Sequence, residues 1–270
     1  MKSGRRSQTR LRATCSKKPP EPSCCICSLR TRRATASSAI RFRIAVVRSS
    51  KRSDPAAETL QTLKLFTASG RPPLKTVLVT GFEPFPGMPV NPTALLMKRL
   101  PRRLIPEVRG TRFLFEILPT TWTGRFEVAE RLRRDLSPDA IVHFGVDGSR
   151  RTINIETRAV NRATRVKPDA GGAHAETSPL QAGAETARTS TLPFRALYEA
   201  AARSGLPVAL SRDAGTYLCN ATLWDSIGSG IPSVFVHVPP LPRGRFDTRP
   251  SLQQIEKAAI LILEETRRRI

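Results

Sequence analysis

Apolar and polar positions follow two alternating periods along residues 74–270. The run KTVLVTGF at 75–82 is short, rich in β-branched residues and closes on a glycine turn, which is typical of a buried strand. The next run, NPTALLMKRL at 91–100, places its leucines on one helical face. Asn91 there is suited to cap a helix and Pro92 to occupy its first position. The pattern therefore predicts a strand followed by a helix.

The same succession continues to the end of the chain. Further strands are predicted at 111–118, 139–145, 152–160, 206–211 and 232–239, and further helices at 122–136, 192–205, 215–227 and 251–269. The polar, glycine-rich stretch 161–190 is expected to hold no element. Strands that alternate with helices predict an α/β class fold: a single α/β/α layered domain at 74–270 with a mostly parallel, twisted sheet.

Residues 1–73 differ from the rest in charge. They hold 17 Lys and Arg against 3 Asp and Glu, a net of +14, whereas residues 74–270 hold 28 against 19, a net of +9. With so few apolar residues, 1–73 is predicted to be a disordered basic extension. The alternatives are a nucleic-acid-binding arm, a transit peptide or an over-extended start of the reading frame.

The composition also excludes some classes of site. No apolar run approaches the roughly 20 residues that cross a bilayer, so no membrane association is expected. The glycines at 81–87 lack the spacing of a dinucleotide-binding loop, and no cofactor is expected. Four cysteines precede position 73, but no second ligand pair follows them at zinc-finger spacing, so no metal is expected. They are Cys15, Cys24, Cys25 and Cys27.

The fifth cysteine, Cys219, is the candidate nucleophile. It follows the turn at Gly215 and stands at the start of a predicted helix, where free amide groups and the helix dipole favour a thiolate. The alternative is a buried cysteine that only fills the core. A nucleophile needs a base, and three histidines are available. His174 lies in a glycine-rich loop, whereas His143 and His237 end apolar strands, and proximity along the chain favours His237.

The third member of such a site would be an acid that orients the imidazole. Glu156 is the lone acid in a strand-like run with Ile153 and Ile155, and a carboxylate there is costly unless it has a partner. Spacing alone leaves three competitors open. These are Asp147, Asp213 and Asp225.

Four segments in this order resemble the pyroglutamyl peptidase I family of cysteine exopeptidases, also called pyrrolidone-carboxylate peptidases. They are VLVTGFEPFPGMPVNPT, HFGVDGSRRTINIETRAVN, AGTYLCN and VFVHVPPLP. The resemblance covers roughly residues 75–245 and a closing helix. It implies Cys219 as nucleophile, His237 as base and Glu156 as orienting acid, acting on peptides with an N-terminal pyroglutamyl residue.

The resemblance also implies a substrate pocket. Phe82 and Phe85 match residues that sandwich the lactam ring, Tyr217 matches another wall position, and Arg165 matches a family arginine after a one-residue gap. Many members carry glutamine where this chain has Val146, so substrate preference is expected to differ.

Together these features predict a metal-independent cysteine peptidase of the cytoplasm, where a thiol stays reduced, with an oligomer possible. Two rivals stay open: a thiol amidohydrolase with another small N-terminal or lactam substrate, and a binding protein whose basic arm engages nucleic acid.

Overall fold

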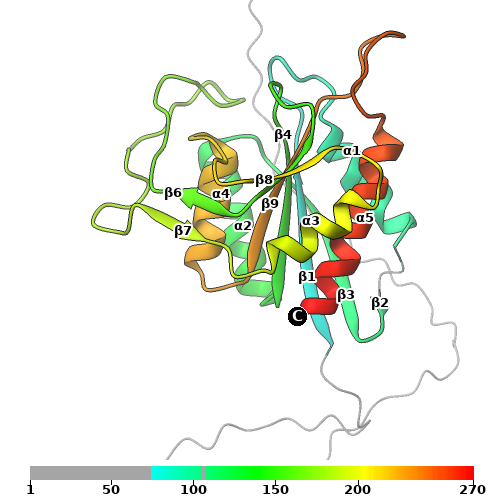
Figure 1. The fold of residues 1–270 in the computed structure, drawn as a ribbon. Coiled ribbons are helices and arrows are strands. Elements are labelled where there is room, and N and C mark those ends of the chain that lie inside the picture. Colours follow the sequence, from blue (N-terminus) through cyan, green and yellow to red (C-terminus); the bar gives the residue numbers. More distant parts are fainter. Residues whose placement is uncertain (1–73, 105–106) are drawn as a thin grey trace, which may run out of the picture. The chain divides into compact units, whose positions relative to one another are not determined.

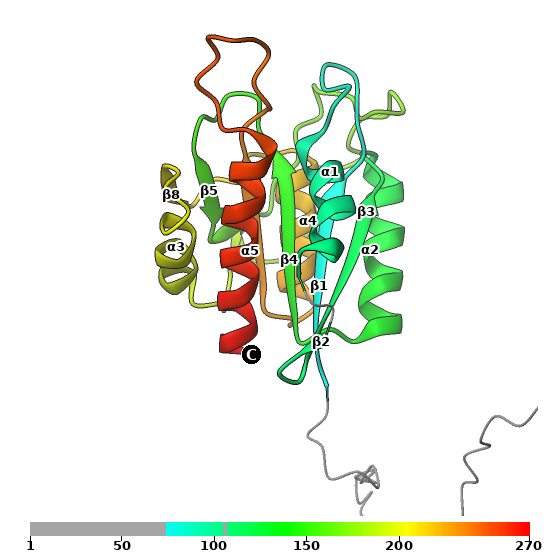
Figure 2. The ribbon, with the colours of Figure 1, turned by 90° about the vertical axis from the view of Figure 1, so that its right-hand side faces the viewer.

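The computed structural model describes residues 74–104 and 107–270, and within them the chain forms a seven-stranded sheet between two layers of helices (Figure 1). The strand order is β2-β3-β1-β4-β9-β5-β8, with β2 Glu107–Val108, β3 Thr111–Leu118, β1 Lys75–Phe82, β4 Ala140–Val146, β9 Ser233–Val238, β5 Ile153–Glu156 and β8 Val208–Ser211. Figure 2 shows the sheet from its face, with its loops gathered beyond one end of the strands.

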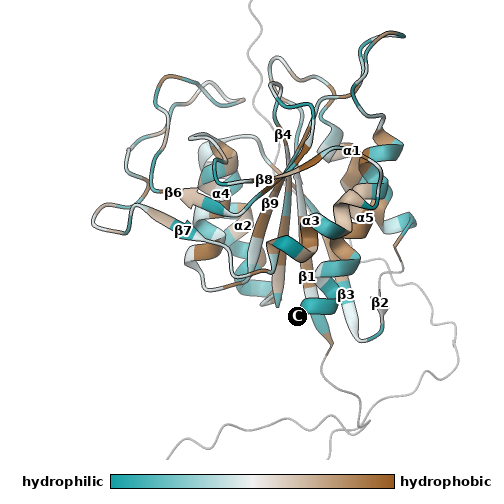
Figure 3. Cartoon of the chain, in the orientation of Figure 1, coloured by the Kyte–Doolittle hydropathy of each residue, from teal (hydrophilic) through white to brown (hydrophobic). Residues whose placement is uncertain are grey.

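The helices cover both faces of the sheet. They are α1 Pro92–Arg99, α2 Trp122–Leu136, α3 Phe194–Ala202, α4 Leu218–Gly228 and α5 Leu252–Arg269, with a short 3-10 helix, η1, at Leu100–Arg102. Helices α1, α3 and α5 share one core with the sheet, and α2 and α4 share the other. The central strands are hydrophobic along most of their length (Figure 3). The predicted layered α/β fold is therefore confirmed.

The cap predicted at Asn91 is present, and two further helices begin at capping residues. The Asn91 side chain accepts a hydrogen bond from Thr93 N at 3.0 Å, and Pro92 is the first residue of α1. The Thr121 side chain caps α2, and Ser251 forms a capping box with Gln254 at the start of α5. These bonds satisfy amide donors that have no acceptor inside the helix.

The sheet is mostly parallel, as predicted, but β5 runs against its neighbour β9. Strand β8 is parallel to β5, and β2 is antiparallel to β3. Because β5 is reversed, its carboxyl end does not lie beside the carboxyl end of β9, and Glu156 pairs with Phe235 rather than with His237.

The predicted single strand at 152–160 is wrong, since the chain leaves the sheet at Thr157. The amide and hydroxyl of Thr157 both donate to Ser211 O, at 2.9 and 3.0 Å, and Thr157 O accepts from Ser190 N at 2.8 Å. The next segment, Arg158–Val160, is β6, which pairs with β7, Ala187–Thr189, in a separate antiparallel sheet. Strand β7 lies in the stretch expected to hold no element.

The predictions for residues 1–73, namely disorder, a nucleic-acid-binding arm, a transit peptide and the absence of zinc at the four early cysteines, lie outside the described residues. Among the helices of the described part, none is long and apolar enough to cross a bilayer.

Candidate active site

Cys219 lies in the first turn of α4, as expected. Gly215 precedes it with φ 77°, in the left-handed region that glycine adopts without strain, and Tyr217 is the N-cap residue. The Tyr217 side chain accepts no hydrogen bond from the helix. The first backbone amides of α4 therefore have no acceptor in their capping residue. The Cys219 thiol is free and partly exposed. It is therefore accessible at the amino end of an 11-residue helix.

His237 and Glu156 meet across the antiparallel pair β9 and β5. Glu156 is directly opposite Phe235, and His237 lies two residues further along β9, so the two side chains project from the same face as diagonal neighbours. His237 Nδ1 donates to Glu156 Oε1 at 2.9 Å, since the carboxylate can only accept. Both side chains are buried. This bond fixes the ring and leaves its Nε2 as the free nitrogen.

Gly145 of β4 makes room for the sulfur. It is opposite His237 in the parallel register of β4 and β9. A Cβ at position 145 would lie 3.2 Å from Cys219 Sγ and 2.4 Å from Phe235 Cζ. The missing side chain therefore lets α4 bring its thiol down onto the sheet beside the imidazole.

The charge balance at His237 favours the imidazolium. Burial by itself lowers the pKa of the ring, but the charge of Cys219, its hydrogen bond to the ring, and the hydrogen bond and charge of Glu156 outweigh burial and raise the pKa of His237 to about 9. The structure thus brings Cys219, His237 and Glu156 into one connected group.

Arg150, which is not among the predicted site residues, also reaches this group. Its Nη2 lies 3.3 Å from Glu156 Oε1, and its Nε donates to Asp147 Oδ2 at 3.1 Å. Burial raises the pKa of Asp147, but hydrogen bonds from Ser149 and Arg150 and the charge of His237 outweigh this and lower it. Asp147 is thus ionised beside the site, without contacting His237 itself. The signal that could have found Arg150 is its place in the loop between β4 and the strand that bears Glu156.

The two predicted pocket phenylalanines have different environments. Phe82 is buried, with its ring centroid 6.1 Å from that of Phe235, which in turn lies 4.8 Å from the His237 ring. Phe85 is half-buried, in a tight turn in which its backbone pairs with Met88. Phe82 therefore belongs to the core under the site, and Phe85 to its rim.

Tyr217, the predicted wall residue, has partners that the sequence analysis did not identify. Its ring meets Trp122 edge-on with centroids 5.4 Å apart, and its hydroxyl donates to Pro168 O at 2.8 Å. Lys167 Nζ lies 4.4 Å from the centroid of Tyr217 and 6.0 Å from that of Phe85. Burial and the charges of Asp169 and Cys219 raise the pKa of Tyr217 to about 12, so the phenol remains neutral.

The other two predicted pocket residues, Val146 and Arg165, lie outside the group formed by Cys219, His237 and Glu156. Val146 is the half-buried last residue of β4, paired with Val238. Arg165 is exposed, and its carbonyl oxygen is bonded at 2.8 Å to the ring of His174, which is exposed as well. The structure places neither Arg165 nor His174 in contact with Cys219 among the interactions of the described residues.

The remaining candidates have other partners. His143 is buried between the hydroxyls of Thr80 and Ser226, at 2.7 and 2.9 Å. Asp225 pairs with Arg125 between α4 and α2. Asp213 accepts from Gly215 N and shapes the turn before α4. None of the three orients His237, whose carboxylate partner is Glu156.

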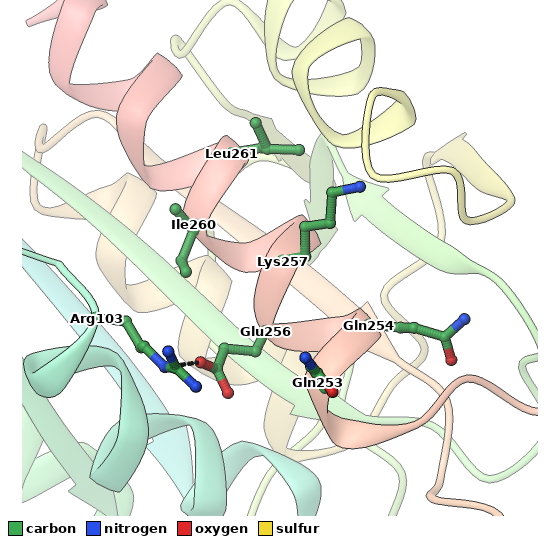
Figure 4. A pocket seen from close by; sticks show the side chains of 7 residues that line it. All are labelled: Arg103, Gln253, Gln254, Glu256, Lys257, Ile260 and Leu261. Carbon is green, nitrogen blue, oxygen red and sulfur yellow. Dashed lines mark ion pairs between the residues drawn. The ribbon is translucent and has the colours of Figure 1, made fainter.

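A separate groove lies between η1 and α5 and contains none of the predicted site residues (Figure 4). Its wall includes Glu256, which is buried and paired with Arg103 at 3.0 Å and with Arg99 at 2.6 Å. In the part of the chain that the structure describes, no three His, Cys, Asp or Glu side chains gather as they would around a metal ion.

A thiol, an imidazole and a carboxylate joined on an α/β sheet are the groups of a cysteine hydrolase. The family model of pyroglutamyl peptidase matches residues 75–262. The pyrrolidone-carboxylate peptidase of Thermococcus onnurineus is 34% identical over 197 residues, which cover 70% of this chain and 96% of that relative. The pyrrolidone-carboxylate peptidase of Pyrococcus furiosus is 36% identical over 177 residues, covering 63% and 84% of the two chains.

Solved structures agree with the sequence relatives. A mutant pyrrolidone carboxyl peptidase from Pyrococcus furiosus superposes with a TM-score of 0.64 at 32% identity and covers 72% of this chain and 98% of its own. The pyrrolidone carboxyl peptidase from Thermococcus litoralis has a TM-score of 0.65 at 27% identity, covering 72% and 94%. The chain belongs to the pyroglutamyl peptidase family, whose members are cysteine peptidases that act on pyroglutamyl peptides.

Proposed function

We propose that the chain hydrolyses the amide bond after an N-terminal pyroglutamyl residue through Cys219, His237 and Glu156. The observation that supports this most strongly is one imidazole bonded to a buried carboxylate at 2.9 Å, beside a free thiol whose charge helps to raise the pKa of the ring. Because the His237 ring is held in one orientation, it can exchange a proton with the sulfur without first reorienting.

The reaction has two halves. The Cys219 thiolate attacks the carbonyl carbon of the pyroglutamyl residue, and a tetrahedral intermediate forms. The imidazolium of His237 then gives its proton to the leaving amine, the carbon–nitrogen bond breaks, and a thioester remains. In the second half, neutral His237 takes a proton from water, whose oxygen attacks the thioester and releases pyroglutamate and the thiolate. Glu156 accepts from Nδ1 throughout and stabilises the charged ring.

The amino end of α4 supports the negative oxygen of the tetrahedral intermediate. Cys219 is the second residue of the helix, so its backbone amide has no acceptor within the helix. We infer that this amide donates to the developing oxyanion. Arg165 is exposed, and among the described interactions it makes no contact with Cys219.

The rim of half-buried aromatic rings suits a flat five-membered lactam. Phe85, Tyr217 and Trp122 provide the apolar surfaces, and Val146 contributes no hydrogen bond to the lactam. We therefore infer weaker selection against lactam analogues than a pocket with a polar side chain at position 146 would give.

We further propose that the chain works in the cytoplasm. The support is chemical: a nucleophilic thiol must stay free, and a reducing compartment keeps it so. Cys219 is a free thiol in the structure.

The test is release of aminomethylcoumarin from its pyroglutamyl amide by the full chain. We expect Cys219→Ser to lower kcat/KM by at least about 1000-fold, because the thiolate makes the first bond. Cys27→Ser is the matched control and should keep wild-type activity. Activity retained by Cys219→Ser would rule out the mechanism. If the wild-type chain does not hydrolyse this substrate but cleaves another N-blocked amide, the result would favour the thiol amidohydrolase.

A further inference from the structure

The carboxylate of Glu156 is fully buried, and His237 alone does not compensate its charge. Its Oε1 accepts from His237 Nδ1, whereas its Oε2 is buried without a hydrogen-bond partner. A buried carboxylate is stable only with compensating charge. In the proposed cycle, His237 alternates between imidazolium and neutral imidazole, so it compensates Glu156 only part of the time.

Arg150 is a permanent cation at the same oxygen. Its Nη2 lies 3.3 Å from Glu156 Oε1. An arginine keeps its charge at any pH at which the protein is folded, and its planar guanidinium offers donors in fixed directions. Arg150 can therefore hold Glu156 in place both before and after His237 gives up its proton.

The guanidinium is held from several sides. Its Nε donates to Asp147 Oδ2 at 3.1 Å, and its Nη2 donates to Asp213 O at 2.9 Å. With the amide of Asn154 oriented so that its nitrogen donates to Thr152, its oxygen accepts from Arg150 Nη1 at 2.8 Å. These partners come from the loop after β4, from β5 and from the turn before α4, so Arg150 links the segments that carry Glu156 and Cys219.

The loop that bears Arg150 is itself braced. Asp147 Oδ1 accepts from the amide of Ser149 at 2.9 Å and from its hydroxyl at 2.7 Å, which leaves Oδ2 for Arg150. The amide of Arg150 donates to Asp147 O at 3.2 Å and closes the turn. Only a quarter of the Arg150 side chain is exposed. The position of the guanidinium is thus set by the loop and is not left to the free rotation of a long side chain.

We propose that Arg150 is a positioning residue that acts through Glu156: it fixes the carboxylate and compensates its charge when His237 is neutral. The inference rests on the proposed function for Cys219, His237 and Glu156, and extends it to a fourth side chain. Arg150 contacts neither the sulfur nor the imidazole among the described interactions, so it takes no proton itself.

The first experiment compares Arg150→Met, Arg150→Lys and Arg151→Met in the full chain. We expect Arg150→Met to lower kcat for the pyroglutamyl amide on the order of 10- to 100-fold with little change in KM, because a misplaced carboxylate misplaces the imidazole. Arg150→Lys keeps the charge but not the planar set of donors, and should recover part of the loss. Arg151→Met, at an exposed neighbour, should match wild type.

The second measurement does not depend on the substrate. The rate of Cys219 alkylation by iodoacetamide at neutral pH, located by peptide mass spectrometry, should fall in Arg150→Met in parallel with kcat. If alkylation of the wild-type chain depends on His237 but the pyroglutamyl amide is not hydrolysed, the proposed substrate is wrong. The alkylation rates of the Arg150 variants would then still test the positioning role of Arg150.

A double variant decides whether Arg150 acts through Glu156. Glu156→Gln keeps an acceptor for His237 but has no charge to compensate. If the inference holds, Arg150→Met should cost less than about twofold in alkylation rate in the Glu156→Gln background, since residues that act as a unit are not additive. Equal losses in both backgrounds, or an Arg150→Met variant as fast as Arg151→Met, would overturn the inference.

Discussion

His143 and His237 lie on the neighbouring strands β4 and β9 and project from the same face of the sheet. Their surroundings differ. His237 faces a carboxylate and a thiol, which raise its pKa to about 9. His143 is bonded to two neutral hydroxyls, and burial, with the charges of Arg133 and Arg125, lowers its pKa to about 3. His143 therefore stays neutral and serves the packing of the core rather than proton transfer.

This environment predicts how His143 affects stability with pH. Between pH 6.5 and about 3, the unfolded chain binds a proton at His143 that the folded chain does not, so its contribution to the free energy of unfolding is present above pH 6.5 and is lost as the pH falls toward 3. In His143→Gln this titration is absent. The stability advantage of wild type over His143→Gln should shrink by up to roughly 1.4 kcal/mol per pH unit across the window.

Urea unfolding of both chains at several pH values from 7 to 4 measures that difference. Carboxylates titrate in both chains and cancel in the comparison. A difference that is constant over this range would mean that His143 binds its proton when folded, which its two hydroxyl partners do not predict.

At the scale of elements, the contact of α4 with β4 and β9 sets the distance between thiol and imidazole. The contact depends on the absence of a side chain at Gly145, where a Cβ would meet Phe235 at 2.4 Å. We expect Gly145→Ala to destabilise the fold by about 1–3 kcal/mol through overpacking and to lower kcat, because α4 or Phe235 must shift.

Gly148→Ala is the matched control, since a Cβ there has no heavy atom within 4 Å. Thermal unfolding and kcat of both variants provide the comparison. Wild-type stability and kcat in Gly145→Ala would show that the close approach of helix and strand is not needed.

The elements that sequence predicts well are those with a strong period of their own. The helix expected at 122–136 is α2 at Trp122–Leu136, and the strand expected at 75–82 is β1. Strand β7 has three residues, too few for a period. Strands β5 and β6 follow each other with only Thr157 between them, so the sequence does not show that β6 pairs with β7 in a second sheet.

The candidate site could be predicted in part for the same reason. The helix start at Cys219 and the apolar run around Glu156 mark both residues locally, and proximity along the chain, together with the family resemblance, favours His237 over His143. The roles of Arg150 and Gly145 depend on pairing. Strand β5 runs antiparallel to β9, and that register places Glu156 diagonally from His237, where Arg150 reaches its carboxylate.

For the whole molecule, the site is assembled from distant parts of the chain. Glu156 and His237 are 81 residues apart in sequence. Cys219 lies on α4, which comes between their two strands in chain order. The family match spans residues 75–262, so the proposed chemistry belongs to the part of the chain that carries +9 of its net charge of +23. That chemistry depends on a thiol that the folded chain makes reactive.

The most direct test of this dependence is the alkylation rate of Cys219 by iodoacetamide at pH 6.5, resolved from the other four cysteines by peptide mass spectrometry. We predict that Cys219 in the folded wild-type chain reacts on the order of tenfold or more faster than in the chain unfolded by guanidinium, and that His237→Asn removes the difference. Equal rates in the folded and unfolded wild-type chain, or an unchanged rate in His237→Asn, would contradict the proposed mechanism.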